Sequence, residues 1–194
     1  VESRHAALTA YLFDAKSVAN RHLVVRDVRR PLSDVTPMRM GSKIVDNGIY
    51  LFDPAERDEF LKLEPKARDL FLPVVGSQEY IRGETRWILM PRLASPAELK
   101  ALPLVVERIK AVREYRAASR KDATRKLAEF PTEFEVTTIP TGPFLAIPKV
   151  SGERRDYIPI GWLEPPTIPS QLLQVVLDAD GWVFGMLTSK MHMA

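Results

Sequence analysis

The chain has no cysteine and only three histidines in 194 residues. Without cysteine, the protein cannot form disulfides, use a thiolate nucleophile or bind zinc through sulfur. The histidines, His5, His22 and His192, are scattered, and none lies at metal-ligand spacing from another histidine or a carboxylate. The sequence therefore predicts no metal site, and the lack of cysteine favours a cytoplasmic location.

Sequence motifs of catalysis and of membrane insertion are also missing. The sequence contains no glycine-rich phosphate loop, no nucleophile elbow and no strand followed by the Gly-x-Gly turn of a nucleotide site. Asp58, Glu64 and Lys66 superficially resemble a nuclease triad, but Pro65 interrupts the helices expected there, whereas such a metal site needs ligands held by strands. No signal peptide or membrane-spanning apolar run is present. We therefore expect no catalytic residue, no cofactor in this chain and no membrane partner.

Proline marks the connections between the expected elements, with 16 prolines against 9 glycines. Helices are predicted to begin at Asp53-Pro54-Ala55-Glu56 and at Ser95-Pro96-Ala97-Glu98, because each has an N-cap, a proline at the first helical position and a glutamate at capping-box spacing. Strand-like apolar runs cover residues 87–90, 135–138, 144–147, 157–160, 174–177 and 182–187. This order predicts an α+β fold, with helices in the first half and a mostly antiparallel sheet in the second.

Positive charge is concentrated in one predicted long basic helix, from about residue 104 to residue 129. It contains eight basic and four acidic residues, while Val105, Ile109 and Val112 form a narrow apolar stripe expected to face a core. A basic helix is usually a solvated surface with ion pairs between successive turns. Here the positive surplus is too concentrated for internal neutralisation, which favours phosphate binding.

A short polar tip lies between two apolar, proline-bearing runs, with Glu153, Arg154 and Arg155 at its centre. If the flanking runs are strands, Glu153 and Arg155 project from a rigid frame. An arginine can donate two hydrogen bonds to guanine O6 and N7, and a carboxylate can accept one from cytosine N4. The pair can therefore read one G·C base pair, with Arg154 suited to a phosphate. The alternative is a solvated turn that contains a salt bridge.

Seven segments carry a further signal and lie at residues 37–43, 75–81, 86–87, 95–99, 102–105, 151–155 and 187–194. In this order they resemble the target recognition domain of MmeI-type adenine-specific DNA methyltransferases, the single-chain restriction-modification enzymes also called Type IIL. The resemblance extends from about residue 11 to residue 194. Gly152 and Lys190 stand where relatives often have serine, which weakens any transfer of a particular DNA sequence.

The resemblance implies that this chain reads double-stranded DNA for a longer enzyme. In that family, a nuclease, a helical connector and an S-adenosylmethionine-dependent adenine-N6 methyltransferase precede the domain. S-adenosylmethionine, and Mg for cleavage, are then cofactors of the parent enzyme, and the methyltransferase domain of the same chain is a partner. Residues 1–36 are expected to be a crossover or linker from that domain, and residues 37–194 the DNA target recognition domain.

The candidate DNA-binding residues fall into two sets. The resemblance implies Glu153 and Arg155, which match the family's tip, as base-reading residues, with Tyr157 after the tip and Lys121 and Thr124 in the matching helix as secondary candidates. Those suited to phosphate contacts, which fix register without carrying sequence information, are Lys43, Arg113, Arg116, Arg120, Arg125, Lys149 and Arg154. The alternative function is a protein-interaction module that uses the basic helix to bind an acidic partner.

Overall fold

A computed structural model describes residues 6–10, 14–16, 19, 22, 24, 35–152 and 154–190. The chain divides into two compact units, residues 1–35 and 36–194. In the first unit, Leu8 and Asp14 form an antiparallel bridge, and the amide of Ala15 donates to the carbonyl of Ala7. The division lies next to the boundary expected after residue 36, whereas the link between residues 1–36 and a methyltransferase domain stays a prediction.

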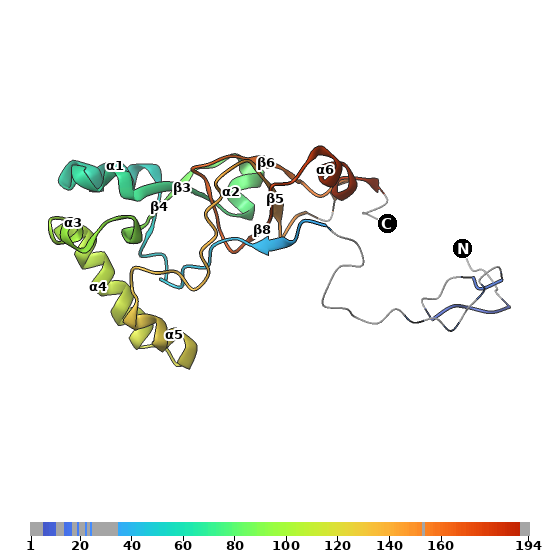
Figure 1. The fold of residues 1–194 in the computed structure, drawn as a ribbon, viewed down its shortest axis with the longest axis horizontal. Helices are drawn as coiled ribbons and strands as arrows, with labels where there is room; N and C mark the ends of the chain where they lie inside the picture. The colour runs from blue at the N-terminus through green and yellow to red at the C-terminus, as the bar shows by residue number, and fades with distance from the viewer. Residues whose placement is uncertain are drawn as a thin grey trace. The chain divides into compact units, whose positions relative to one another are not determined.

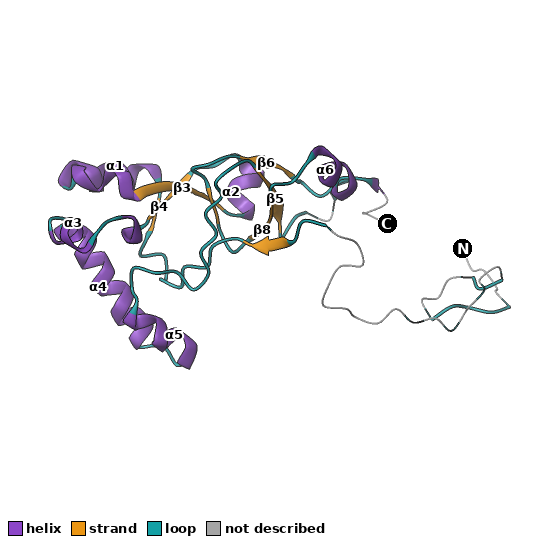
Figure 2. Cartoon of the chain, viewed as in Figure 1, coloured by secondary structure: helices purple, strands orange, loops and turns teal. Residues whose placement is uncertain are grey.

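The second unit contains two four-stranded sheets (Figures 1 and 2). The first has the order β1-β8-β5-β6, and all of its pairs are antiparallel. The second has the order β2-β4-β3-β7, with two antiparallel pairs and a parallel pair between β3 and β7. The strands are β1 (Met38–Met40), β2 (Leu51–Phe52), β3 (Phe71–Val75), β4 (Arg86–Leu89), β5 (Phe144–Pro148), β6 (Gly161–Leu163), β7 (Ile168–Pro169) and β8 (Leu173–Leu177). The predicted α+β class with mostly antiparallel pairing is confirmed.

Two helices begin where the capping signals predicted them. The carboxylate of Asp53 accepts a hydrogen bond from the amide of Glu56 at 2.8 Å, and Glu56 accepts one from the amide of Asp53 at 2.9 Å. Ser95 and Glu98 form the same reciprocal pair. The helical segments are α1 (Pro54–Leu63), η1 (Pro65–Leu70), α2 (Ser77–Arg82), η2 (Pro91–Leu93), α3 (Pro96–Lys100), α4 (Pro103–Ala117), α5 (Asp122–Lys126), η3 (Leu127–Glu129) and α6 (Gly181–Leu187).

The larger core lies around the second sheet. Phe52, Phe60 and Phe71 meet edge to face, with ring centroids 5.0 to 5.5 Å apart. Val105 and Val112 of α4 are fully buried in the same core, as the apolar stripe predicted. A smaller core belongs to the first sheet and contains Phe144, Ala146, Leu173 and Val175.

The order of elements differs from the prediction. β1 to β4 all lie in the first half of the chain, and residues 182–187, predicted as a strand, belong to α6. The carboxylate of Asp180 accepts a hydrogen bond from the amide of Val183 at 2.9 Å. This N-cap favours a helix strongly enough to outweigh the strand propensity of Trp182 and Val183.

Two other predicted strands are absent from the described structure. Residues 135–138 contribute only a bridge between Val136 and Lys43. Residues 157–160 form no ladder, because Pro159 lacks an amide hydrogen and the amide of Ile160 donates to the carbonyl of Ile158 at 2.8 Å in a tight turn. The strand begins one residue later, at Gly161.

The predicted long basic helix is wrong, because a turn separates α4 from α5. Lys121 has extended backbone angles, φ −84° and ψ 124°, and begins α5 as its N-cap. The hydroxyl of Ser119 accepts a hydrogen bond from the amide of Lys121 at 3.2 Å. Such a local side-chain bond competes with continuation of the helix. The basic residues after Ala117 therefore do not continue the face of α4.

Candidate nucleic-acid interface

The polar tip is the connection between β5 and β6, which pair antiparallel from Phe144↔Leu163 to Ala146↔Gly161. β5 also pairs with β8, so it is an interior strand of its sheet. The amide of Lys149 donates to the carbonyl of Leu172 at 3.0 Å and ties the start of the connection to the same sheet. The tip therefore extends from a buried, doubly paired strand.

The tip residues that the structure describes are exposed. The amide of Arg155 donates to the carbonyl of Gly152 at 3.2 Å, which closes a turn, and Arg154, Arg155, Lys149 and Tyr157 face solvent. Within the described ranges, no ion pair involves Arg154 or Arg155. Both guanidinium groups are thus available to a ligand. The predicted base-reading residue Glu153 lies outside the described residues.

The basic residues of α4 and α5 separate into exposed cations and structural ones. Arg113, Arg120 and Lys121 are exposed. Arg125 is part of the local structure, because its guanidinium donates to the carbonyls of Ser119 at 3.0 Å and Arg120 at 2.9 Å, and to the carboxylate of Asp122 at 3.0 Å. Arg125 still exposes 45% of its side chain, so it is also accessible to a ligand.

Arg116 is not a phosphate ligand in this structure, contrary to the prediction. Its side chain is fully buried and donates to five backbone carbonyl oxygens. These bonds occupy all five N–H groups of the guanidinium. The acceptors are Ile44 at 2.8 Å, Val45 at 2.9 Å, Leu127 at 3.1 Å, Phe130 at 2.9 Å and Glu133 at 2.9 Å. The helical periodicity that placed Arg116 with exposed cations could not reveal these distant acceptors.

The other candidates lie in mixed surroundings. Lys43 forms an ion pair with Glu135 at 2.7 Å, with about a third of each side chain exposed. Thr124 is half-buried on α5. Figure 1 shows α4 and α5 extending on the side of β4, away from β5 and β6. The fold therefore groups Lys121, Thr124 and Arg125 in one region and the tip in another, and does not bring them into one cluster.

A loop that the sequence analysis did not single out connects β1 to β2. Val45 and Asn47 both have φ of 56°, and Gly48 has φ of 80°. The buried carboxylate of Asp46 accepts hydrogen bonds from the amides of Gly48 at 3.2 Å and Tyr50 at 2.7 Å. The Asn47-Gly48 pair is a turn signal, but the left-handed conformation of Val45 has no signal in the sequence. Left-handed backbone in a β-branched residue is unusual and requires support from its surroundings.

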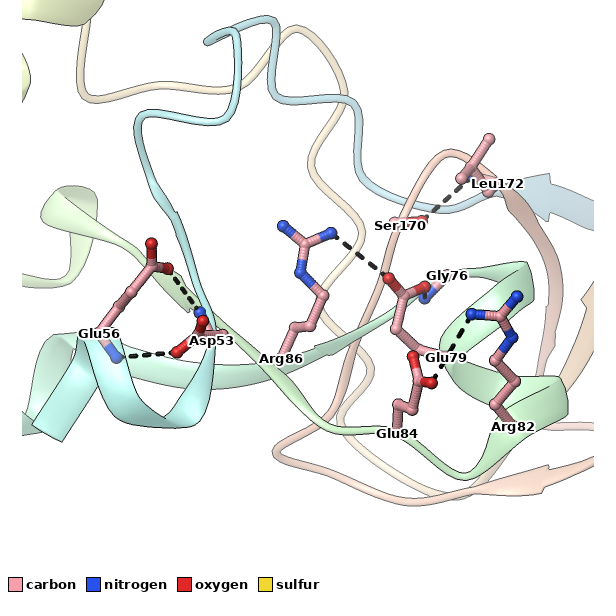
Figure 3. A network of polar contacts seen from close by, with 9 residues as sticks. All are labelled: Asp53, Glu56, Gly76, Glu79, Arg82, Glu84, Arg86, Ser170 and Leu172. Atoms are coloured by element: carbon pink, nitrogen blue, oxygen red, sulfur yellow. Dashed lines mark hydrogen bonds and ion pairs between the residues drawn. The ribbon is translucent and has the colours of Figure 1, made fainter.

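This loop lines a cleft of about 410 Å³, and Arg86, Tyr115 and Gln171 are among the other residues that line it. Figure 3 shows the polar contacts on one wall, where the carboxylate of Glu79 accepts from the amide of Gly76 at 3.1 Å and pairs with Arg86 at 3.4 Å. These bonds hold the start of α2 against β4. The polar groups of this wall therefore already satisfy one another.

The described residues offer no metal site, since no three histidine or acidic side chains among them gather in a suitable arrangement. The buried carboxylate of Glu64 instead has a structural role, because it accepts hydrogen bonds from the amides of Leu104 at 3.1 Å and Val105 at 3.0 Å at the start of α4. No helix within the described ranges is long and apolar enough to cross a membrane.

Known proteins resemble this chain over nearly its whole length. The family described as MmeI, target recognition domain, matches residues 19–194. DNA methyltransferase A of Bacillus subtilis (strain 168) is 33% identical over 186 residues, which are 96% of this chain and 21% of that protein. The solved structure of the Type IIL restriction-modification enzyme MmeI in complex with DNA superimposes with a TM-score of 0.86 and 34% identity, over 97% of this chain and 24% of that one.

The chain thus spans about a fifth of the length of the curated relative and about a quarter of the solved structure. The two-sheet arrangement, the exposed tip and the separate basic region belong to the part that these proteins share with it. Because the family match includes all of the second unit and part of the first, the chain belongs to the MmeI target recognition domain family.

Proposed function

We propose that this chain recognises a specific sequence in double-stranded DNA for a longer restriction-modification enzyme. The observation that carries the proposal is the fold similarity, at 34% identity and a TM-score of 0.86, to an enzyme solved in complex with DNA. Family membership supports the same role. The exposed cations of the tip and of α5 supply the chemistry that DNA binding needs.

DNA binding in this proposal uses two kinds of contact, to phosphates and to base edges. Exposed lysine and arginine side chains neutralise phosphates and fix the register on the duplex. The residues for this role are Lys43, Arg113, Arg120, Arg125, Lys149 and Arg154. Arg155 lies in the connection between β5 and β6, and its exposed guanidinium forms no ion pair with the described residues, so it suits bidentate donation to guanine in the major groove. Glu153, Tyr157, Lys121 and Thr124 are the further candidates for base contacts.

The parent enzyme is proposed to be an adenine-specific DNA methyltransferase with endonuclease activity, which transfers a methyl group from S-adenosylmethionine and cleaves with Mg. The residues of this chain fit neither S-adenosylmethionine nor Mg. The sequence has no glycine-rich nucleotide turn, and the described residues have no acidic cluster for a metal. Both groups then belong to other parts of the parent, and this chain contributes sequence choice without catalysis.

The proposal is tested by selecting bound duplexes from a randomised DNA pool at low salt with the 194-residue protein. We expect enrichment of a short motif. The selection is repeated with Glu153→Lys combined with Arg155→Asp, which exchanges the hydrogen-bonding character of the two positions. The exchanged protein is expected to enrich a motif that differs at one base pair.

The possible outcomes separate the alternatives. Enrichment that changes at one base pair supports sequence reading by the tip. Salt-sensitive binding without enrichment contradicts sequence recognition by this chain, and leaves only phosphate binding. Absence of DNA binding contradicts the proposal entirely and favours the protein-interaction alternative.

A further inference from the structure

The buried side chain of Arg116 joins the end of α4 and the segment after α5 to the loop between β1 and β2. The five acceptors of Arg116 come from two segments, residues 44–45 before β2 and residues 127–133 after α5. Arg116 itself lies in the last turn of α4. Three segments far apart in the sequence therefore meet at a single guanidinium, whose planar, forked donors accept little variation in geometry.

This arrangement fixes α5 at both of its ends. Arg125 donates to the carbonyls of Ser119 and Arg120, in the turn before α5. Arg116 donates to the carbonyl of Leu127, the residue that caps the C-terminus of α5. A helix of five residues has too few internal hydrogen bonds to be stable alone. The orientation of α5 therefore depends on these two arginines.

The loop on the other side of Arg116 also depends on outside support. Val45, with φ of 56°, presents its carbonyl to the Arg116 Nε at 2.9 Å. The hydroxyl of Tyr50 makes a parallel connection by donating to the carbonyl of Pro131 at 2.9 Å. Lys43, a candidate phosphate contact, immediately precedes the Ile44 carbonyl that Arg116 binds. The same hydrogen bonds thus hold the loop, its lysine and the segment after α5 in one arrangement.

We propose that Arg116 is a positioning residue for DNA sequence recognition, which fixes α5, and with it Lys121 and Thr124, relative to the β1–β2 loop. The inference rests on the proposed function. It gives Arg116 a role in specificity, although its side chain is buried and bound to carbonyls and so is not itself a DNA ligand.

Specificity is the property that such positioning controls. A long cationic side chain can follow a phosphate through small movements of its helix, so phosphate contacts tolerate displacement. Direct hydrogen bonds to a base edge require the side chain within a fraction of an ångström of one position. Loosening α5 is therefore expected to reduce discrimination at the base pairs that Lys121 and Thr124 contact, more than it reduces overall affinity.

The test compares base-pair preferences, obtained from the enriched DNA motif, in several variants of the 194-residue protein. Lys121→Ala and Thr124→Ala first identify the base pairs that α5 contacts, and Arg155→Ala identifies the one that the tip contacts. Arg116→Lys then keeps the positive charge but loses the five-donor fork. Arg68→Lys makes the same change at an exposed arginine of η1, outside the proposed DNA-binding residues, and serves as the matched control. Thermal unfolding measured by circular dichroism reports the folded fraction of each variant.

We expect Arg116→Lys to lower the preference at the α5 base pairs by about fivefold, and to leave the preference at the Arg155 base pair unchanged. Arg68→Lys should alter neither preference. A lower folded fraction reduces the affinity for every DNA alike and cannot produce this pattern. Equal losses at all base pairs, unchanged preferences, or an α5 that contacts no base pair would each overturn the inference while leaving sequence recognition intact.

Tyr50→Phe provides a second route if Arg116→Lys fails to fold. This variant removes only the hydroxyl that donates to Pro131, and its ring can keep the packing of the tyrosine. A selective loss of about twofold at the α5 base pairs supports the inference, and an unchanged pattern in Tyr50→Phe contradicts it. If the unaltered protein enriches no motif, the proposed function itself has failed, which is a different result.

Discussion

The hydroxyl of Tyr50 donates a hydrogen bond of 2.9 Å to the carbonyl oxygen of Pro131, 81 residues further along the chain. Tyr50 is fully buried. Burial raises its pKa, the nearby Arg116 cation opposes that rise and Asp46 adds to it. Because the folded state raises this pKa, the associated stability is present below the unfolded value, near about 10, and is lost as the pH rises above it.

This relationship predicts a loss of stability in alkaline solution that Tyr50→Phe reduces. We expect the free energy of unfolding in urea to fall between about pH 9 and about pH 11, and to fall less steeply in Tyr50→Phe. At neutral pH the variant should lose about 1 kcal/mol, because the Pro131 carbonyl loses its donor. Tyr115→Phe, at an exposed tyrosine, is the control. If the free energy of unfolding falls equally with rising pH in Tyr50→Phe and in the unaltered protein, Tyr50 is not the cause of the alkaline loss of stability.

Replacement of Arg116 by methionine should destabilise the fold strongly. Arg116→Met leaves five buried carbonyls without their donor, so we expect a loss of about 3 kcal/mol or more in the free energy of unfolding. Arg113→Met, at an exposed position of the same helix, should change it by less than about 0.5 kcal/mol. Equal midpoints for the two variants in urea would show that the buried network contributes no stability.

Arg155→Ala should affect one base pair. We expect a loss of about 1–3 kcal/mol for the preferred duplex and little change for a duplex altered at that base pair. Arg113→Ala should instead weaken binding to all duplexes and reduce the slope of log affinity against log salt by about one. Fluorescence anisotropy titrations over a range of salt concentrations measure both effects. A uniform loss in Arg155→Ala would remove this residue from the base-reading set.

The N-cap of α1 offers a test of local stability away from the DNA-binding residues. Asp53→Ala removes the acceptor for the Glu56 amide, and we expect it to cost about 1 kcal/mol. Asp69→Ala, at another exposed aspartate, should cost less than about 0.5 kcal/mol. DNA affinity, corrected for the folded fraction, should be the same in both variants. A difference in affinity would place α1 in the interface.

Capping motifs predicted helix starts correctly, whereas only some of the apolar runs predicted strands. The capping pairs Asp53–Glu56 and Ser95–Glu98 marked the starts of α1 and α3 correctly, since each motif needs only four adjacent residues. The apolar runs at 87–90, 144–147 and 174–177 correspond to β4, β5 and β8. Strands of two or three residues, such as β2 and β7, are too short to give a periodic pattern.

Features that depend on distant partners were not predictable. Arg116 has the same charge and spacing as exposed neighbours, and only the carbonyls of residues 44–45 and 127–133 distinguish it. Residues 182–187 were expected to form a strand, but they belong to α6, where Trp182 is 64% exposed. The resemblance supplied the family, whereas the tip was already a candidate site because it lies between two apolar, proline-bearing runs.

Both sheets are completed by strands from the two halves of the chain. β1 pairs with β8 through Met38↔Val176, and β3 pairs with β7 through Val74↔Ile168. Pairing over such separations gives the unit a high contact order, which slows folding. During synthesis, neither sheet can be completed until residues 168–177 have emerged from the ribosome. The described residues of the tip, at 149–157, contribute no strand to either sheet. The sequence of the tip can therefore change without altering the steps by which the two sheets assemble, so the candidate base-reading residues that it carries can vary independently of folding.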